Sequence, residues 1–126
     1  MVGALRYDDL CAPMDWIPLT ETTQLDAIDE ASRTRPVLIF KHSTSCSISR
    51  TALDRLQRAW TKEDNAGHAV YLLDLLKFRA VSNAVAERYG ITHESPQTLV
   101  IQEGKCDWSA SHFSITYSDT VQALAA

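Results

Sequence analysis

The stretch Val37-Leu38-Ile39-Phe40-Lys41-His42-Ser43-Thr44-Ser45-Cys46-Ser47-Ile48-Ser49 contains two patterns that together decide the fold. Its first four residues form an apolar run that is too short for a helix and rich in strand formers, which predicts a strand buried on both faces. After a polar turn, apolar residues recur at helical spacing at positions 48, 52, 53, 56, 59 and 60. The stretch therefore predicts a central strand that leads into a helix, with Cys46 at the junction.

Strand and helix patterns alternate on both sides of this stretch. Further strands are predicted at residues 16–19, 69–73, 98–102 and 105–110, the last two as a hairpin around Glu103-Gly104. Further helices are predicted after a cap at Thr22 or Thr23, over residues 81–89 with Gly90 as the stop, and after Thr116, where Asp119 gives a capping-box-like start. The order βαβαβαββα predicts an α/β fold of the thioredoxin type, with a central mixed five-stranded sheet flanked by helices.

The composition is that of one mildly acidic domain. The 126 residues include 12 Lys+Arg and 16 Asp+Glu, which gives a formal net charge of −4. Without a basic run, the chain lacks the charge that nucleic acids and anionic membranes attract. No apolar run approaches the length of about 18 residues that a membrane span needs, and no signal peptide is recognisable. We expect residues 1–14 to form an extension, residues 15–126 to form one domain, and the protein to be cytoplasmic.

The cysteines point to thiol chemistry at one position. Cys11, Cys46 and Cys106 are odd in number and form no Cys-x-x-Cys pair, so they cannot make a closed disulfide framework. Cys46 lies where the positive end of a helix dipole stabilises a thiolate, the nucleophilic form of the side chain. A small buried side chain without reactivity is the structural alternative. Because Ser49 stands where a dithiol enzyme has its second cysteine, we predict a monothiol route that needs an external thiol.

Several polar residues are candidates to support this thiol. Ser45, Ser47 and Ser49 surround it, and a Ser49 hydroxyl can donate to a thiolate or simply occupy an ordinary position in the helix. The histidines His42 and His93 are candidates for proton transfer or thiolate stabilisation. We interpret His68 as a solvated loop residue and His112 as either a loop anchor or a catalytic residue. The spacing of these residues supports no metal site.

A proline is predicted to face the thiol across the site. Pro96 immediately precedes a predicted strand, at the joint where thioredoxin-type folds carry a cis proline opposite the active cysteine. A cis Ser95-Pro96 bond would open the backbone of Ser95 to an extended substrate, whereas a trans proline would only start the strand.

Two segments carry a resemblance to a known family. Residues 41–49 resemble the active-site segment of the monothiol bacilliredoxins, the thioredoxin-like proteins of the bacillithiol system. The stretch His93-Glu94-Ser95-Pro96-Gln97, Trp108 and the segment from Ala110 to Thr116 are similar to that family's cis-proline loop, hairpin and entry to the last helix. The similarity spans residues 22 to 125. It implies a thioredoxin fold, Cys46 as the redox nucleophile, and Ser95-Pro96 as the loop that faces the substrate.

The resemblance also implies a reaction. Cys46 would remove bacillithiol from S-bacillithiolated proteins through a mixed disulfide, with bacillithiol as a low-molecular-weight co-substrate and no tightly bound cofactor. The family commonly has proline after the cysteine, and Ser47 here is a departure. Cys106 is a second departure, and we weigh it as a strand residue or as a distant resolving thiol.

Two other functions remain alternatives to the removal of bacillithiol. One is a glutathione-using monothiol glutaredoxin, and the other is a redox-inactive binding module of the same fold.

Overall fold

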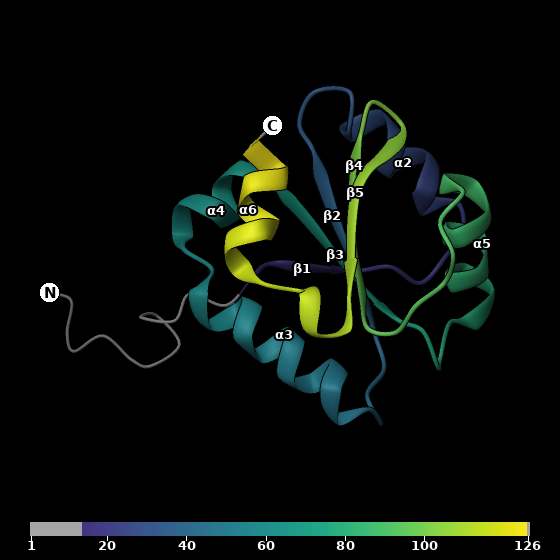
Figure 1. Ribbon diagram of the computed structural model, residues 1–126. Helices are drawn as coiled ribbons and strands as arrows, with labels where there is room; N and C mark the ends of the chain where they lie inside the picture. The colour runs from purple at the N-terminus through teal and green to yellow at the C-terminus, as the bar shows by residue number, and fades with distance from the viewer. Residues whose placement is uncertain (1–13, 126) are drawn as a thin grey trace, which may run out of the picture.

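The computed structural model describes residues 14–125, which form a mixed sheet between two layers of helices (Figure 1). The strands are β1 (Trp16–Pro18), β2 (Val37–His42), β3 (Ala69–Asp74), β4 (Gln97–Gln102) and β5 (Lys105–Ser111). The helices are α2 (Gln24–Ala31), α3 (Ser47–Ala59), α4 (Lys62–Gly67), α5 (Arg79–Tyr89) and α6 (Tyr117–Ala125), and a short 3-10 turn, η1 (His112–Ser114), precedes α6. The predicted α/β fold with a mixed five-stranded sheet is confirmed.

The sheet has the order β1-β3-β2-β4-β5, with β2 in the middle. Strands β1, β3 and β2 run parallel, whereas β4 is antiparallel to β2 and β5 is antiparallel to β4. All six residues of β2 are buried, as the apolar run predicts. Strand β2 leads directly into the crossover helix α3. The carboxyl end of β2 and the first turn of α3 therefore lie at the same end of the sheet.

Side-chain alternation along β2 divides the core into two halves. Val37 and Ile39 pack with α2 and α5 on one face, and Leu38 and Phe40 pack with α3 and α6 on the other. Lys41 therefore belongs to the α5 face, while His42 belongs to the α3 face. The two residues share one end of one strand, but their side chains enter different layers of the molecule.

The sequence predicted some of the helix ends correctly and others not. Gly90 ends α5 with a positive φ of 65°, a conformation that glycine adopts without strain. The Thr116 hydroxyl accepts the N–H of Asp119 at 3.1 Å, as expected for the start of α6. The predicted threonine cap of α2 is wrong, because Thr23 is helical and makes no capping bond. The side-chain oxygen of Gln24 instead accepts the backbone N–H groups of Thr20 and Glu21.

Two further features differ from the sequence prediction. Helix α4 was not expected, and a capping box between Thr61 and Asp64 starts it. Met14, the last residue of the predicted extension, is buried in the core beneath α3 and α6. Residues 1–13, including Cys11, lie outside the described part of the chain.

Candidate functional site

The strand register brings the two candidate segments to one end of the sheet. Lys41 pairs with Gln97 between β2 and β4, so the residues one step beyond this pair are His42 and Pro96. The Ser95-Pro96 peptide bond is cis. The turn η1 completes this end, because the N–H of His112 donates to the carbonyl of Pro96 at 3.1 Å and η1 packs against α3. We call this part of the molecule the cis-proline end.

Cys46 is held by its backbone at the start of α3. It is the N-cap residue, with an extended φ of −104°, and its side chain is partly exposed. Its N–H donates to the carbonyl of Ser43, and its own carbonyl accepts the N–H of Arg50, both at 3.1 Å. The sulfur accepts no capping hydrogen bond, and the first turn of α3 has no acidic residue. The thiol is thus partly exposed at the first turn of α3.

Ser49 is a structural clamp beneath Cys46. Its side chain is fully buried, and its oxygen accepts the N–H of Ser43 at 2.9 Å. The same oxygen lies 2.7 Å from Nδ1 of His42. His42 ends β2 and Ser43 begins the loop that leads to Cys46, so the hydroxyl that replaces a second thiol ties this loop to the end of the strand. Burial, with a smaller effect from Arg50, lowers the pKa of His42 against the opposing effect of Asp74, so the ring is neutral at pH 7.

Removing this clamp should destabilise the protein. In Ser49→Ala, the N–H of Ser43 and Nδ1 of His42 lose a buried partner, so we expect the free energy of unfolding to fall by about 1–3 kcal/mol. Urea denaturation under reducing conditions measures the loss. Ser47→Ala is the matched control, because Ser47 is exposed and should change stability by less than about 0.5 kcal/mol. Equal stability of the two variants would contradict the clamp.

A second polar cluster lies on the other face of the sheet. Lys41 is fully buried, and its Nζ donates to the carbonyl of Ser82 and lies next to Nδ1 of His93, both at 3.2 Å. Burial lowers the pKa of Lys41 to about 8. Lys41 was not among the candidates predicted from the sequence, although strand alternation could have placed it beneath α5. His42 and His93, which the sequence grouped together, thus belong to separate clusters on opposite faces.

The loop before the cis proline is anchored at several points. The side chain of Gln97 is buried, donates to the carbonyl of Thr92 at 3.0 Å and accepts the N–H of Glu94. His112 has a positive φ of 53°, and its Nε2 lies 3.7 Å from a carboxylate oxygen of Glu94. These contacts connect the loop to β4 and η1, so Ser95 is presented on a supported backbone.

The remaining candidates differ in exposure. Ser45 and Ser47 are exposed, and Ser95 is partly exposed beside the cis bond. His68 lies between α4 and β3, as predicted, but it is only partly exposed and its Nδ1 is buried without a hydrogen-bond partner. Among residues 14–125, no group of three or more histidine, cysteine or acidic side chains is arranged to hold a metal ion. No helix in this range is long and apolar enough to cross a membrane.

Cys106 lies at the opposite end of the sheet from Cys46. It pairs with Ile101, which in turn pairs with Val37 at the start of β2, whereas Cys46 follows the end of β2. The Cys106 thiol donates to the carbonyl of Trp108 at 3.3 Å, and burial raises its pKa. In this fold it is a packed strand residue and not a resolving thiol for Cys46.

Comparisons with known proteins agree with this architecture. A family model described as monothiol bacilliredoxin BrxC matches residues 17–120. A solved structure with a thioredoxin fold, named as a proposed oxidoreductase, is 29% identical with a TM-score of 0.74, and the match covers 85% of this chain and 91% of that one. Thioredoxin from Malassezia sympodialis is 13% identical with a TM-score of 0.70, covering 99% of this chain and 96% of its own. Thioredoxin from Fasciola hepatica is 13% identical with a TM-score of 0.64, covering 86% and 95%.

These last two matches show the fold alone. The family match and the oxidoreductase neighbour together make the chain a thiol oxidoreductase of the thioredoxin fold. The family model covers most of the sequence, including Cys46 and the cis-proline loop. The chain therefore belongs to the monothiol bacilliredoxin family.

Proposed function

We propose that this protein removes bacillithiol from S-bacillithiolated proteins through a mixed disulfide on Cys46. One observation carries the proposal: a partly exposed cysteine occupies the N-cap position of α3 at the cis-proline end, and a buried serine occupies the position of a second thiol. Family membership supports bacillithiol as the thiol that is exchanged. A reducing compartment such as the cytoplasm would keep Cys46 in the thiol form that the reaction needs.

The proposed reaction has two exchange steps. In the first, the Cys46 thiolate attacks the bacillithiol sulfur of the mixed disulfide, the protein sulfur leaves as a thiolate, and water protonates it. In the second, the thiolate of a free low-molecular-weight thiol attacks the disulfide on Cys46, which restores the Cys46 thiolate and releases a small disulfide. The electrons that reduce the substrate protein thus come from the second thiol. No step needs a bound cofactor.

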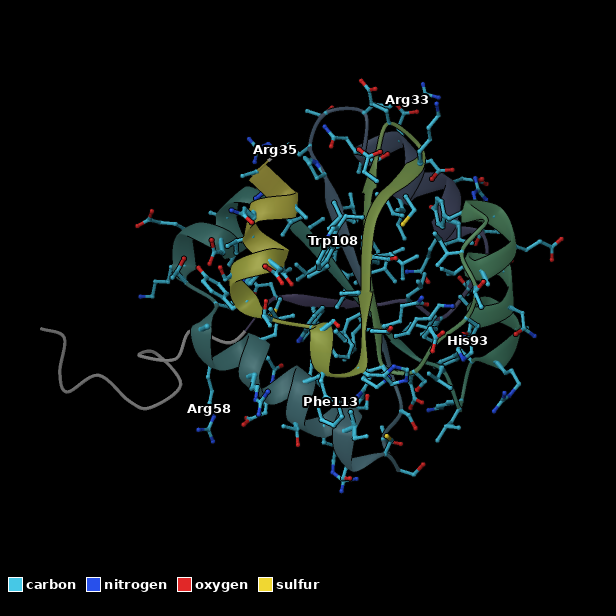
Figure 2. All side chains as sticks on the ribbon, viewed as in Figure 1. Arg33, Arg35, Arg58, His93, Trp108 and Phe113 are labelled. Atoms are coloured by element: carbon cyan, nitrogen blue, oxygen red, sulfur yellow. The ribbon has the colours of Figure 1, made fainter. Side chains whose placement is uncertain are left out.

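The surface around Cys46 suits a protein substrate. Leu76 is 44% exposed and follows Leu75, whose N–H donates to the carbonyl of His42. Phe113 is 74% exposed in η1 and follows His112, whose N–H donates to the carbonyl of Pro96. Figure 2 shows Phe113 beside α3, toward the end of the molecule opposite Arg33 and Arg35. Apolar side chains at the rim of a reactive centre favour contact with a partner surface.

The test compares three adducts of one carrier protein. Bacillithiol, glutathione or cysteine is placed on the same carrier cysteine, and release of the carrier thiol is followed with a fixed concentration of the matching free thiol. We expect the bacillithiol adduct to be removed at least about ten-fold faster than the other two, which corresponds to about 1.4 kcal/mol of discrimination. Faster removal of glutathione would assign a glutaredoxin-like activity instead. Failure with all three adducts would support a redox-inactive binding module.

A further inference from the structure

Lys41 is a buried cation without an opposite charge. Its side chain has no exposed area, and none of the salt bridges among residues 14–125 includes it. Its two hydrogen-bond partners, the carbonyl of Ser82 and Nδ1 of His93, are both neutral acceptors. A buried charge that lacks a counterion costs folding free energy. The contacts of Lys41 should therefore explain why a lysine stands here.

The contact with Lys41 fixes the tautomer of His93. An ammonium group has no lone pair and can only donate, so Nδ1 of His93 must be the acceptor and the proton of the neutral ring resides on Nε2. The Ser82 hydroxyl lies 3.4 Å from the same Nδ1. Burial, Lys41 and Arg79 lower the pKa of His93, and Glu94 opposes them, so the ring is neutral at pH 7.

The Nδ1 edge of the His93 ring is turned inward, which leaves the protonated Nε2 edge as the one available to a ligand. His93 is exposed, although its Nδ1 is turned inward to Lys41, and the two ring nitrogens lie on different edges. It belongs to the loop that ends at the cis Pro96, and Figure 2 shows it beside α5. The Lys41 charge behind the ring polarises the outer N–H, and Arg79 adds positive potential. An N–H donor in such a field favours an anionic acceptor.

We propose that Lys41 is a positioning residue that holds His93 as an outward N–H donor for a carboxylate on the thiol exchanged at Cys46. This inference rests on the proposed function and adds a ligand feature to it. The proposal commits to a carboxylate of the small thiol, because the loop of His93 ends at the cis-proline end, where both exchange steps hold the small thiol on Cys46.

Small disulfides test the carboxylate directly. Dithiodiglycolate carries two carboxylates, bis(2-hydroxyethyl) disulfide carries none, and the rate of adduct formation on Cys46 with each is followed by intact mass. The ratio of the two rates cancels the reactivity of Cys46 itself. We expect this ratio to fall on the order of ten-fold in Lys41→Met and in His93→Ala. Lys77→Met removes an exposed positive charge that lies over the Phe78 ring, and it should change the ratio less than about two-fold.

The pH dependence of this rate ratio is a second test of the role of Lys41. The wild-type ratio should fall as the pH rises from 7 to 9, because Lys41 with its pKa of about 8 loses its charge, and Lys41→Met should show no such fall. Equal ratios in the wild type and in both variants would overturn the assignment of the carboxylate. An equal fall in Lys77→Met would also overturn it, because general surface charge would then explain the preference.

Nitrogen-15 spectra of the His93 ring test the positioning role without any reaction. We expect a protonated Nε2 and an acceptor Nδ1 in the wild type at pH 7, and a mixture of tautomers in Lys41→Met. A wild-type ring protonated on Nδ1 would contradict the role of Lys41. If Cys46 reacts with neither disulfide, the proposed function fails and the carboxylate assignment fails with it, whereas the spectra still decide the positioning role.

Discussion

Cys46→Ser is expected to abolish thiol exchange, with a loss of at least about a thousand-fold in rate, because a serine hydroxyl is not ionised at neutral pH and forms no mixed disulfide. The other described cysteine cannot replace it, since Cys106 lies at the far end of the sheet and is bonded to the carbonyl of Trp108. Release of a thiol from a bacillithiolated carrier protein measures the loss.

Two cysteine variants are the matched controls. Cys106→Ser and Cys11→Ser each remove one thiol and should keep the rate within about two-fold of the wild type. A large loss in Cys106→Ser with unchanged stability would contradict the assignment of the reaction to Cys46 alone. Retained exchange in Cys46→Ser would contradict it outright.

Lys41→Met is expected to stabilise the protein at pH 7 by about 1–3 kcal/mol, because methionine fills a similar volume without burying a charge. Burial lowers the pKa of Lys41 from 10.5 to about 8, and this difference corresponds to about 3 kcal/mol. The gain falls short of that value because Nδ1 of His93 loses a donor.

The pH dependence of this effect has a definite sign. Between pH 8 and pH 10.5 the unfolded chain binds more protons at Lys41 than the folded chain, so wild-type stability from this group rises with pH. The advantage of Lys41→Met should therefore shrink as the pH passes 8. Urea denaturation at pH 7 and pH 9.5 measures both variants, with the exposed Lys77→Met as the control. A less stable Lys41→Met at pH 7, or an unchanged difference at pH 9.5, would contradict the buried charge.

Together these two variants separate function from stability. Cys46 is partly exposed and should contribute little to folding, whereas Lys41 costs stability and is explained by its effect on His93. A residue that destabilises the fold while it arranges a loop at the reactive end is typical of a functional position. The sequence alone shows only a lysine at the end of an apolar run.

Local patterns predicted much of the fold. The apolar run of β2, the helical spacing of α3 and the stop at Gly90 were read correctly, because each depends on short-range sequence. The Glu103-Gly104 turn was also read correctly, and both residues have positive φ values, as a tight hairpin requires. Helix α4 was missed because residues 62–67 have no apolar stripe, although the Thr61 to Asp64 spacing was a visible start signal.

The arrangement of the site could not be predicted from local sequence patterns, because it depends on contacts between distant segments. The sequence predicted that His42 and His93 both support the thiol, but alternation along β2 sends Lys41 and His42 to opposite faces. His42 therefore contacts Ser49 in the clamp below Cys46, whereas His93 contacts Lys41 and reaches the cis-proline end only through its loop. For Ser49 the sequence left open a bond to the thiolate or an ordinary helix position, and its hydroxyl instead contacts Ser43 and His42. Such contacts are set by packing between distant segments, which the register of β2 and β4 determines.

The most direct measurement of the central claim is the intact mass of the protein after brief mixing with a bacillithiolated carrier in the absence of free thiol. Without a second thiol the reaction should stop after its first step, with one bacillithiol on this protein and one free thiol on the carrier. Peptide mapping should place the adduct on Cys46. An unmodified protein, or a bacillithiol adduct located on another cysteine, would contradict the account.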